Sequence, residues 1–60
     1  GAAYVVLVHN HPSGQAQASS ADIAITHTLQ DILHKVDIRV LDHMIVADNK
    51  VFSFFEADIL

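Results

Sequence analysis

The pattern of apolar and polar positions predicts a short α/β unit with the order strand, helix, strand, strand. Residues 4–8 form a continuous run of β-branched and aromatic side chains, which is typical of a central strand buried on both faces of a sheet. Residues 38–47 and 51–54 have the composition of two further strands. Asp48 to Lys50 between them predicts a hairpin turn, and a terminal turn is expected after residue 55.

A helix is expected between the first two strands, from about Ser19 to about Val36. Successive helical residues lie ~100° apart, so one apolar stripe should pack on the sheet. This stripe consists of Ile25, Leu29, Ile32, Leu33 and Val36. His27 and His34 lie outside the stripe and are expected to face solvent. Asp37 tolerates the left-handed backbone that would end the helix.

The composition limits the chain to one small domain. Of its 60 residues, 52% are hydrophobic and 17% are charged, and none is cysteine. A core of this size is marginal on its own. The lack of cysteine removes disulfides and thiolate metal ligands, which fits a cytoplasmic protein. The apolar start has no basic flank and reaches His9 within nine residues, so neither a signal peptide nor a membrane span is expected.

The charge balance disfavours nucleic acid as a direct partner. The net charge is −4, and Lys and Arg together number 3, so the chain lacks the basic footprint that phosphate binding requires. Its phenylalanines are not interleaved with basic residues, and we interpret them as core and hairpin packing rather than as a base-stacking surface. These residues are Phe52, Phe54 and Phe55.

Two histidines stand one residue apart where the first strand gives way to a loop. In an extended segment His9 and His11 point the same way, with Cα atoms ~6.6 Å apart, so both imidazoles can share one cation. They can also be ordinary polar residues at a strand end. Asp22 is expected on the inward side of the helix, where a lone carboxylate is costly unless it is paired. A divalent cation held by these three side chains would compensate it and leave a position for water.

A second interpretation of Asp22 stays open, because Ser19-x-x-Asp22 fits a helix capping box, and capping is commoner than catalysis. Two other metal-site patterns are excluded. Nucleobase deaminases need H-x-E and a P-C-x-x-C segment, whereas this chain has His11 at the third position and no cysteine. The string His9-Asn10-His11 is not an HNH nuclease motif either, since that name describes residues dispersed through a ββα element.

The spacing His9-x-His11-Pro12, six residues, Ser19, two residues, Asp22 resembles the JAMM motif of the JAB/MPN-plus metalloprotease superfamily. More narrowly, nearly the whole chain resembles RadC-like proteins. The matching positions are HNHPSG at 9–14, Thr26, Leu29, Leu41-Asp42-His43, Ile45-Val46 and Phe52-Ser53-Phe54. The resemblance implies an α/β fold, a βαββ fragment of a three-layer JAB/MPN-type (cytidine-deaminase-like) domain with the helix packed on a mixed sheet.

The resemblance also implies a function. It assigns His9, His11 and Asp22 as Zn²⁺ ligands and Ser19 as the catalytic residue that stabilises the reacting oxygen. Such a site would make the protein a zinc-dependent hydrolase that uses activated water on a peptide or isopeptide-like amide bond. A protein or peptide substrate would then be the partner. The DNA-repair label of the RadC-like branch is not adopted.

One departure from the family pattern opens an alternative. The superfamily's general-base glutamate lies on an earlier strand, and no position of this chain matches it. We therefore expect residues 1–60 to be the C-terminal half of a RadC-like JAB/MPN domain. The alternative function is a catalytically incomplete fragment that binds metal or a protein partner without turnover. Self-association through an exposed sheet edge is expected on the same ground. Asp42 and His43 receive no role beyond a turn or a hydrogen-bonded pair.

Overall fold

The computed structural model describes residues 3–60, and its elements follow the predicted order. Strand β1 (Ala3–Asn10) leads through a loop to helix α1 (Ser20–Lys35), which is followed by strands β2 (Ile38–Ala47) and β3 (Lys50–Ser53). The α/β class and the βαββ order are therefore confirmed, with β3 beginning one residue earlier than predicted.

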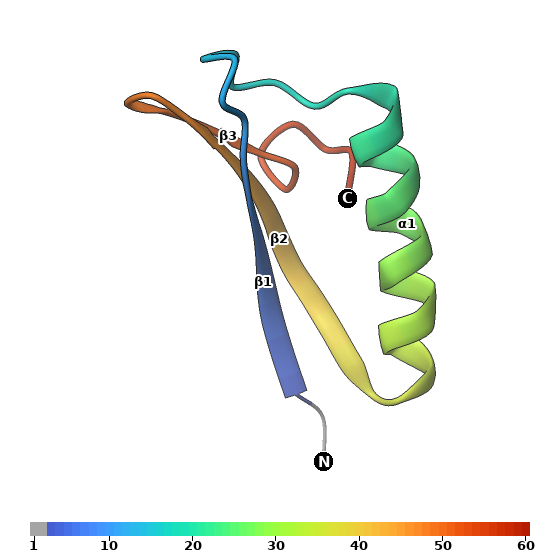
Figure 1. The fold of residues 1–60 in the computed structure, drawn as a ribbon. Coiled ribbons are helices and arrows are strands. Elements are labelled where there is room, and N and C mark those ends of the chain that lie inside the picture. The colour runs from blue at the N-terminus through green and yellow to red at the C-terminus, as the bar shows by residue number, and fades with distance from the viewer. Residues whose placement is uncertain (1–2) are drawn as a thin grey trace.

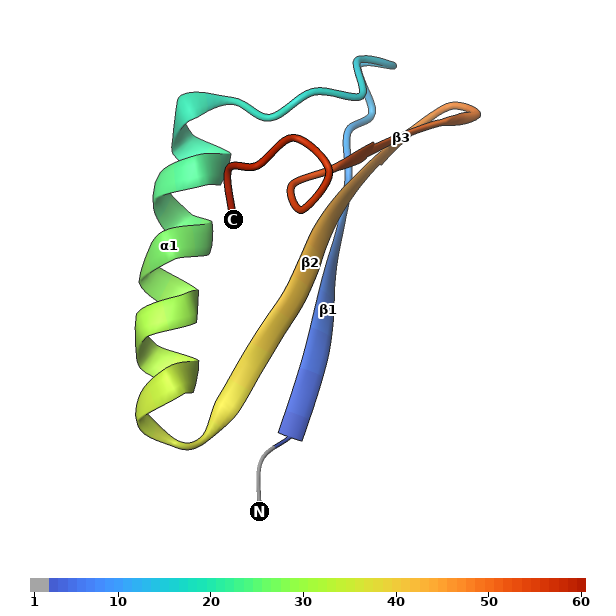
Figure 2. The same ribbon diagram turned by 180° about the vertical axis from the view of Figure 1, so that it is seen from behind.

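The three strands form one mixed sheet in the order β1-β2-β3. Strand β1 pairs with β2 in parallel, and β3 returns antiparallel to β2 as a hairpin. Helix α1 is the crossover between the parallel strands and covers one face of the sheet (Figures 1 and 2). The chain after β3 turns back toward the first half of α1 (Figure 1). The loop after β1 enters α1 at the end of the sheet where β1 has its carboxyl end (Figure 1).

Strand β1 lies at the edge of the described sheet, so the prediction of a central strand is wrong here. Tyr4, Val6 and Val8 are exposed, whereas the alternate residues Val5 and Leu7 are half-buried. A continuous apolar run indicates a strand with both faces covered. Within residues 3–60, however, α1 covers only one of the two faces, which leaves every second side chain of β1 in solvent.

The inward face of α1 also differs from the predicted apolar stripe. Ile25, Ile32 and Val36 are 53%, 54% and 63% exposed, whereas Asp22 and Thr26 are buried and Leu29 and Leu33 half-buried. At ~100° per residue, Asp22, Thr26, Leu29 and Leu33 form one line along the helix. Asp22 contacts His9 of β1 and Thr26 contacts His43 of β2, so polar contacts with the sheet accompany this rotation in place of the apolar stripe.

The buried hydrophobic core lies along β2 and the turn that follows β3. It consists of Val40, Ile45, Ala47 and Phe54. Phe54 thus packs as predicted and Phe52 is half-buried, but Phe55, its neighbour in the turn after β3, is 69% exposed. Among residues 3–60, no helix is both long and apolar enough to span a membrane.

The helix ends where the sequence predicts. Val36 is the C-cap, and Asp37 adopts a left-handed backbone with φ 63°. The N–H of Asp37 donates a hydrogen bond to the carbonyl oxygen of His34 at 3.0 Å. His27 and His34 are exposed, as expected from their place outside the apolar stripe.

Candidate metal centre

Two histidines and one aspartate meet where β1 ends and α1 begins. His9 lies in β1, His11 follows it in the loop, and Asp22 lies in the first turn of α1. One ligand atom from each side chain lies within 4.8 Å of the other two. Among the residues that the structure describes, this is the group of His, Cys, Asp and Glu side chains that could hold a metal ion. The structure thus brings the three predicted ligands together, and their binding of a metal stays a prediction.

The ring of His11 is oriented by a hydrogen bond on its far side. Its Nδ1 lies 3.1 Å from the carbonyl oxygen of Gln15, which can only accept, so Nδ1 carries a hydrogen and donates it. In the neutral ring, Nε2 then presents a lone pair to Asp22 Oδ2 at 3.2 Å. Since the Nε2 lone pair and the Asp22 carboxylate are both acceptors, this arrangement favours a cation bound by the two groups. A backbone carbonyl that fixes the tautomer is also the usual partner of a metal-bound histidine.

Asp22 is held in its charged form. Its side chain is 10% exposed, with Oδ1 at 3.4 Å from His9 Nδ1. The N–H of Ser19 donates a hydrogen bond to Oδ2 at 3.0 Å. This bond lowers the pKa of the Asp22 carboxyl below its usual value and outweighs burial, which acts in the opposite direction. His11 and His9 lower the pKa further. The site therefore presents a negative charge to both imidazoles.

Ser19 is the N-cap of α1, and the predicted capping box is present. The Asp22 N–H donates to Ser19 Oγ at 3.1 Å, while the Asp22 side chain accepts from the Ser19 backbone. The capping and metal interpretations of Asp22 are thus compatible, because Oδ1 remains directed to His9. The Ser19 hydroxyl uses a lone pair in this bond and keeps its hydrogen free to donate. Ser19 and His11 both line a cavity of about 230 Å³.

Thr26 and His43 lie beside the three candidate ligands, and the sequence assigned them no part in the site. Both side chains are buried, and Thr26 Oγ1 lies 2.6 Å from His43 Nδ1. The His43 ring stacks on His9 and on Phe54, with centroids 6.0 Å and 4.5 Å apart. Burial lowers the pKa of His43, and the neighbouring His9 adds to this effect. The family resemblance was the one signal for these two residues.

Asp42 serves the fold rather than the metal centre. It lies within β2, as the strand predicted over 38–47 implies, so of the two local interpretations, a turn or a hydrogen-bonded pair with His43, the structure shows the pair. Its carboxylate accepts hydrogen bonds from the Ser53 hydroxyl at 2.6 Å, the Phe55 N–H at 2.9 Å and the His43 N–H at 2.7 Å. Burial raises the pKa of Asp42, but these bonds outweigh it and hold the pKa below its usual value. Asp42 thereby ties β2 to the turn after β3.

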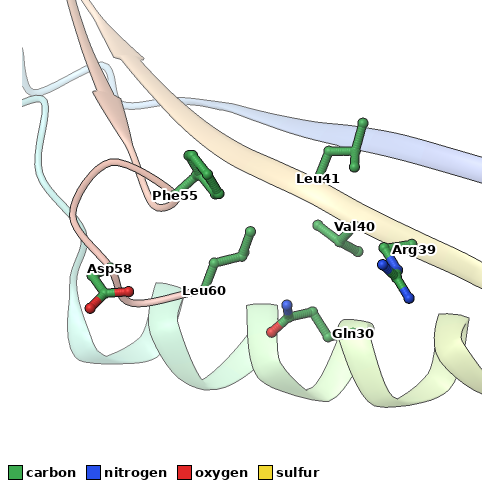
Figure 3. Close-up of a pocket in the computed structure, with 7 residues that line it drawn as sticks. All are labelled: Gln30, Arg39, Val40, Leu41, Phe55, Asp58 and Leu60. Carbon is green, nitrogen blue, oxygen red and sulfur yellow. The ribbon is translucent and has the colours of Figure 1, made fainter.

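A larger cavity, of about 480 Å³, lies away from the candidate ligands (Figure 3). Figure 3 shows it between α1, β2 and the end of the chain, where Leu60 points toward Val40; Phe55 and Leu41 also line it. The remaining lining residues are Gln30, Arg39 and Asp58. None of the three candidate ligands lines it, so the case for a site rests on the ligand geometry and not on cavity size.

The fold and the site define a class of protein, an α/β unit with a candidate mononuclear metal centre at the start of its helix. Comparison with protein families identifies the family within this class: the RadC-like JAB domain family matches residues 1–59. The chain belongs to this family.

Curated relatives support the same family assignment. A UPF0758 protein of Legionella pneumophila (strain Lens) is 52% identical over 54 residues, which cover 90% of this chain and 24% of that protein. A UPF0758 protein of Nitrosococcus oceani is 56% identical over 59 residues, or 98% of this chain and 26% of that protein. A UPF0758 protein of Photobacterium profundum is 56% identical over 52 residues, which cover 87% of this chain and 23% of that protein. The chain spans about a quarter of the length of these relatives.

Proposed function

We propose that the chain carries the metal centre of a zinc-dependent hydrolase of the JAMM type, which cleaves a peptide or isopeptide-like amide bond with activated water. The observation that carries this proposal is the convergence of three ligand atoms within 4.8 Å, with His11 Nε2 at 3.2 Å and His9 Nδ1 at 3.4 Å from the Asp22 carboxylate. Two imidazole nitrogens and one carboxylate are the ligand set of a catalytic zinc site with a fourth position open.

The residues present fit a zinc ion, because their donor atoms already lie within 4.8 Å of one another around a buried carboxylate. When bound, zinc polarises a carbonyl group and activates water near neutral pH. The Gln15 carbonyl keeps His11 in the tautomer that binds a cation. The Ser19 hydroxyl has a hydrogen to donate to the oxygen that gains charge during the reaction.

The general base is proposed to lie outside the described residues. Within residues 3–60, the cluster contains one carboxylate, and Asp22 is already committed to the histidines and to Ser19. The family pattern implies a glutamate on an earlier strand, whose proton transfer would contribute about 10²–10⁴-fold to the rate. The hydrolase activity and its substrate are therefore proposed for the whole protein.

A second candidate function is a module that holds metal or a protein partner without turnover. The single carboxylate of the described cluster favours it. Two surfaces suit a partner: the free edge of β1 and the exposed face that carries Tyr4, Val6 and Val8. For both candidate functions the proposed partner is a peptide or protein. A second copy of the chain, paired at the β1 edge, is one such partner.

The experiment uses a whole protein of the relatives' length that contains these sixty residues. It is loaded with zinc and incubated in H₂¹⁸O with a library of peptides and lysine-branched peptides, and mass spectrometry reads new carboxyl ends. We expect zinc-dependent cuts with one ¹⁸O per cut, and a rate about 10²-fold lower in Ser19→Ala, the cost of one lost oxyanion donor. Ser20→Ala is the matched control. Stoichiometric zinc without any cut would contradict the hydrolase and favour the second candidate.

A further inference from the structure

Thr26 and His43 link two of the candidate ligands through buried hydrogen bonds and ring stacking. The Thr26 hydroxyl donates to the backbone carbonyl oxygen of Asp22 at 2.7 Å, and its oxygen lies 2.6 Å from His43 Nδ1. Thr26 is 0% exposed and His43 is 5% exposed. The bond to Asp22 lies within α1, and the bond to His43 joins α1 to β2, so together they tie the first turn of the helix to the sheet.

The direction of these bonds determines the tautomer of His43. A hydroxyl has one hydrogen, and Thr26 donates it to the Asp22 carbonyl, which can only accept. With that hydrogen on the Asp22 carbonyl, the geometry assigns the Nδ1 hydrogen of His43 to the bond with Thr26, which leaves Nε2 without a hydrogen in the neutral ring. The same ring stacks on His9 at 6.0 Å with an interplanar angle of 23°. His43 thus contacts one ligand by its face and another ligand's helix by its edge.

We propose that Thr26 and His43 form a positioning pair that sets the geometry and the affinity of the His9, His11 and Asp22 metal centre. The side chain of His9 is 43% exposed, so stacking on a fixed ring limits the orientations it samples. Thr26 binds both the backbone carbonyl of Asp22 and the ring of His43, so it holds the Asp22 backbone beside His43 of β2. This inference rests on the proposed metal binding and adds two positioning residues to it.

The test compares zinc affinity and the visible spectrum of the Co²⁺ form in variants of the chain. Thr26→Val keeps the shape of the side chain and removes the hydroxyl, and Thr26→Ser keeps the hydroxyl. Loss of a partner of this kind typically costs about 10–100-fold in metal affinity. We expect Thr26→Val to weaken zinc binding by about 10-fold and to change the Co²⁺ ligand-field bands. Thr26→Ser should restore both.

Thr28→Val is the matched control. Thr28 lies on the same helix and makes the same kind of hydroxyl bond, to the Ala24 carbonyl at 3.1 Å, but it is exposed and does not contact His43. Its affinity and Co²⁺ spectrum should equal those of the original chain. Circular dichroism of the metal-free proteins shows whether each variant folds. A folded Thr26→Val with unchanged affinity and spectrum would overturn the proposal.

A measurement on the unsubstituted chain covers the case in which Thr26→Val does not fold. Long-range ¹H–¹⁵N correlation of the histidine rings reads the tautomer of His43 directly. We expect the hydrogen on Nδ1; a hydrogen on Nε2 alone would mean that Thr26 donates to His43 and not to Asp22, which would overturn the link from the pair to the ligand. Failure of the proposed function looks different: the unsubstituted chain would bind no zinc at all, and the positioning role would fall with it.

Discussion

His11 Nε2 lies 3.2 Å from Asp22 Oδ2, while the opposite nitrogen of the same ring donates to the Gln15 carbonyl at 3.1 Å. The loop between β1 and α1 therefore sets the tautomer, and the helix supplies the carboxylate. Because a neutral ring turns a lone pair toward an anion here, the arrangement suits a metal ion shared by His11, Asp22 and His9.

The capping role of Ser19 is separable from the binding of metal. Ser19→Ala removes the acceptor of the Asp22 N–H, and we expect the free energy of unfolding to fall by about 1 kcal/mol. The backbone N–H of Ser19 still donates to Asp22, so the bound metal should remain. Urea unfolding and elemental analysis measure the two quantities. Ser20→Ala is the control, and loss of the metal in Ser19→Ala alone would refute the separation.

Asp42 makes stability depend on acid pH. Its pKa is below the usual 3.8 in the folded chain, so its stabilising effect is present above about pH 3.8 and is lost as the pH falls through the folded pKa. Asp42→Asn leaves buried donors poorly paired, and we expect a loss of about 1–3 kcal/mol at pH 7. The difference from the original chain should shrink toward pH 3. A difference that stays constant with pH would contradict this role.

The two loops beside the site come into close contact at Gly14. Gly14 has φ 80°, and a Cβ built on it would lie 2.8 Å from Asp48 Oδ2. We expect Gly14→Ala to destabilise the chain by about 1–2 kcal/mol, from backbone strain plus this contact.

Asp48→Gly separates the two causes, because it removes the carboxylate at a position whose own φ is 54°. In a double-variant cycle, the contact part of the Gly14→Ala cost should disappear and the strain part should remain. Full recovery in the Asp48→Gly background would show that strain at Gly14 contributes nothing.

Strand β1 offers an unpaired edge and an exposed apolar face, and we expect the isolated chain to associate through them. Among residues 3–60, no strand pairs with the outer edge of β1, and Val8 is 68% exposed. Val8→Lys should lower the mass measured by sedimentation equilibrium toward that of the monomer. Thr28→Lys on α1 is a control at an exposed position. A monomeric unsubstituted chain at high concentration would exclude self-association.

The elements follow from local sequence because their signals are local. The β-branched run of β1, the Ser19 to Asp22 cap and the left-handed Asp37 each depend on neighbours within a few residues. The spacing of His9 and His11 also follows locally, since it is set by strand geometry. The inward position of Asp22 on the helix suggested it as the third ligand, the family resemblance supported it, and the fold places it beside both histidines.

Burial was harder to predict, because it depends on contacts between distant residues. Ile25 is exposed and Thr26 buried although a hydropathy pattern ranks them the other way. The reason is the bond from Thr26 to His43, which is 17 residues away and outweighs an apolar contact in setting the rotation of α1. Periodicity contains no information on such a pair. The environment of Asp42 and His43 was missed for the same reason.

The most direct test of the metal centre is the zinc content of the purified chain, measured by elemental analysis beside an identically prepared His11→Ala, Asp22→Ala double variant. The geometry of His9, His11 and Asp22 predicts close to one zinc per chain, lost in the double variant. Circular dichroism of the metal-free proteins controls for folding. A folded original chain without metal, or equal zinc in both proteins, would contradict the site.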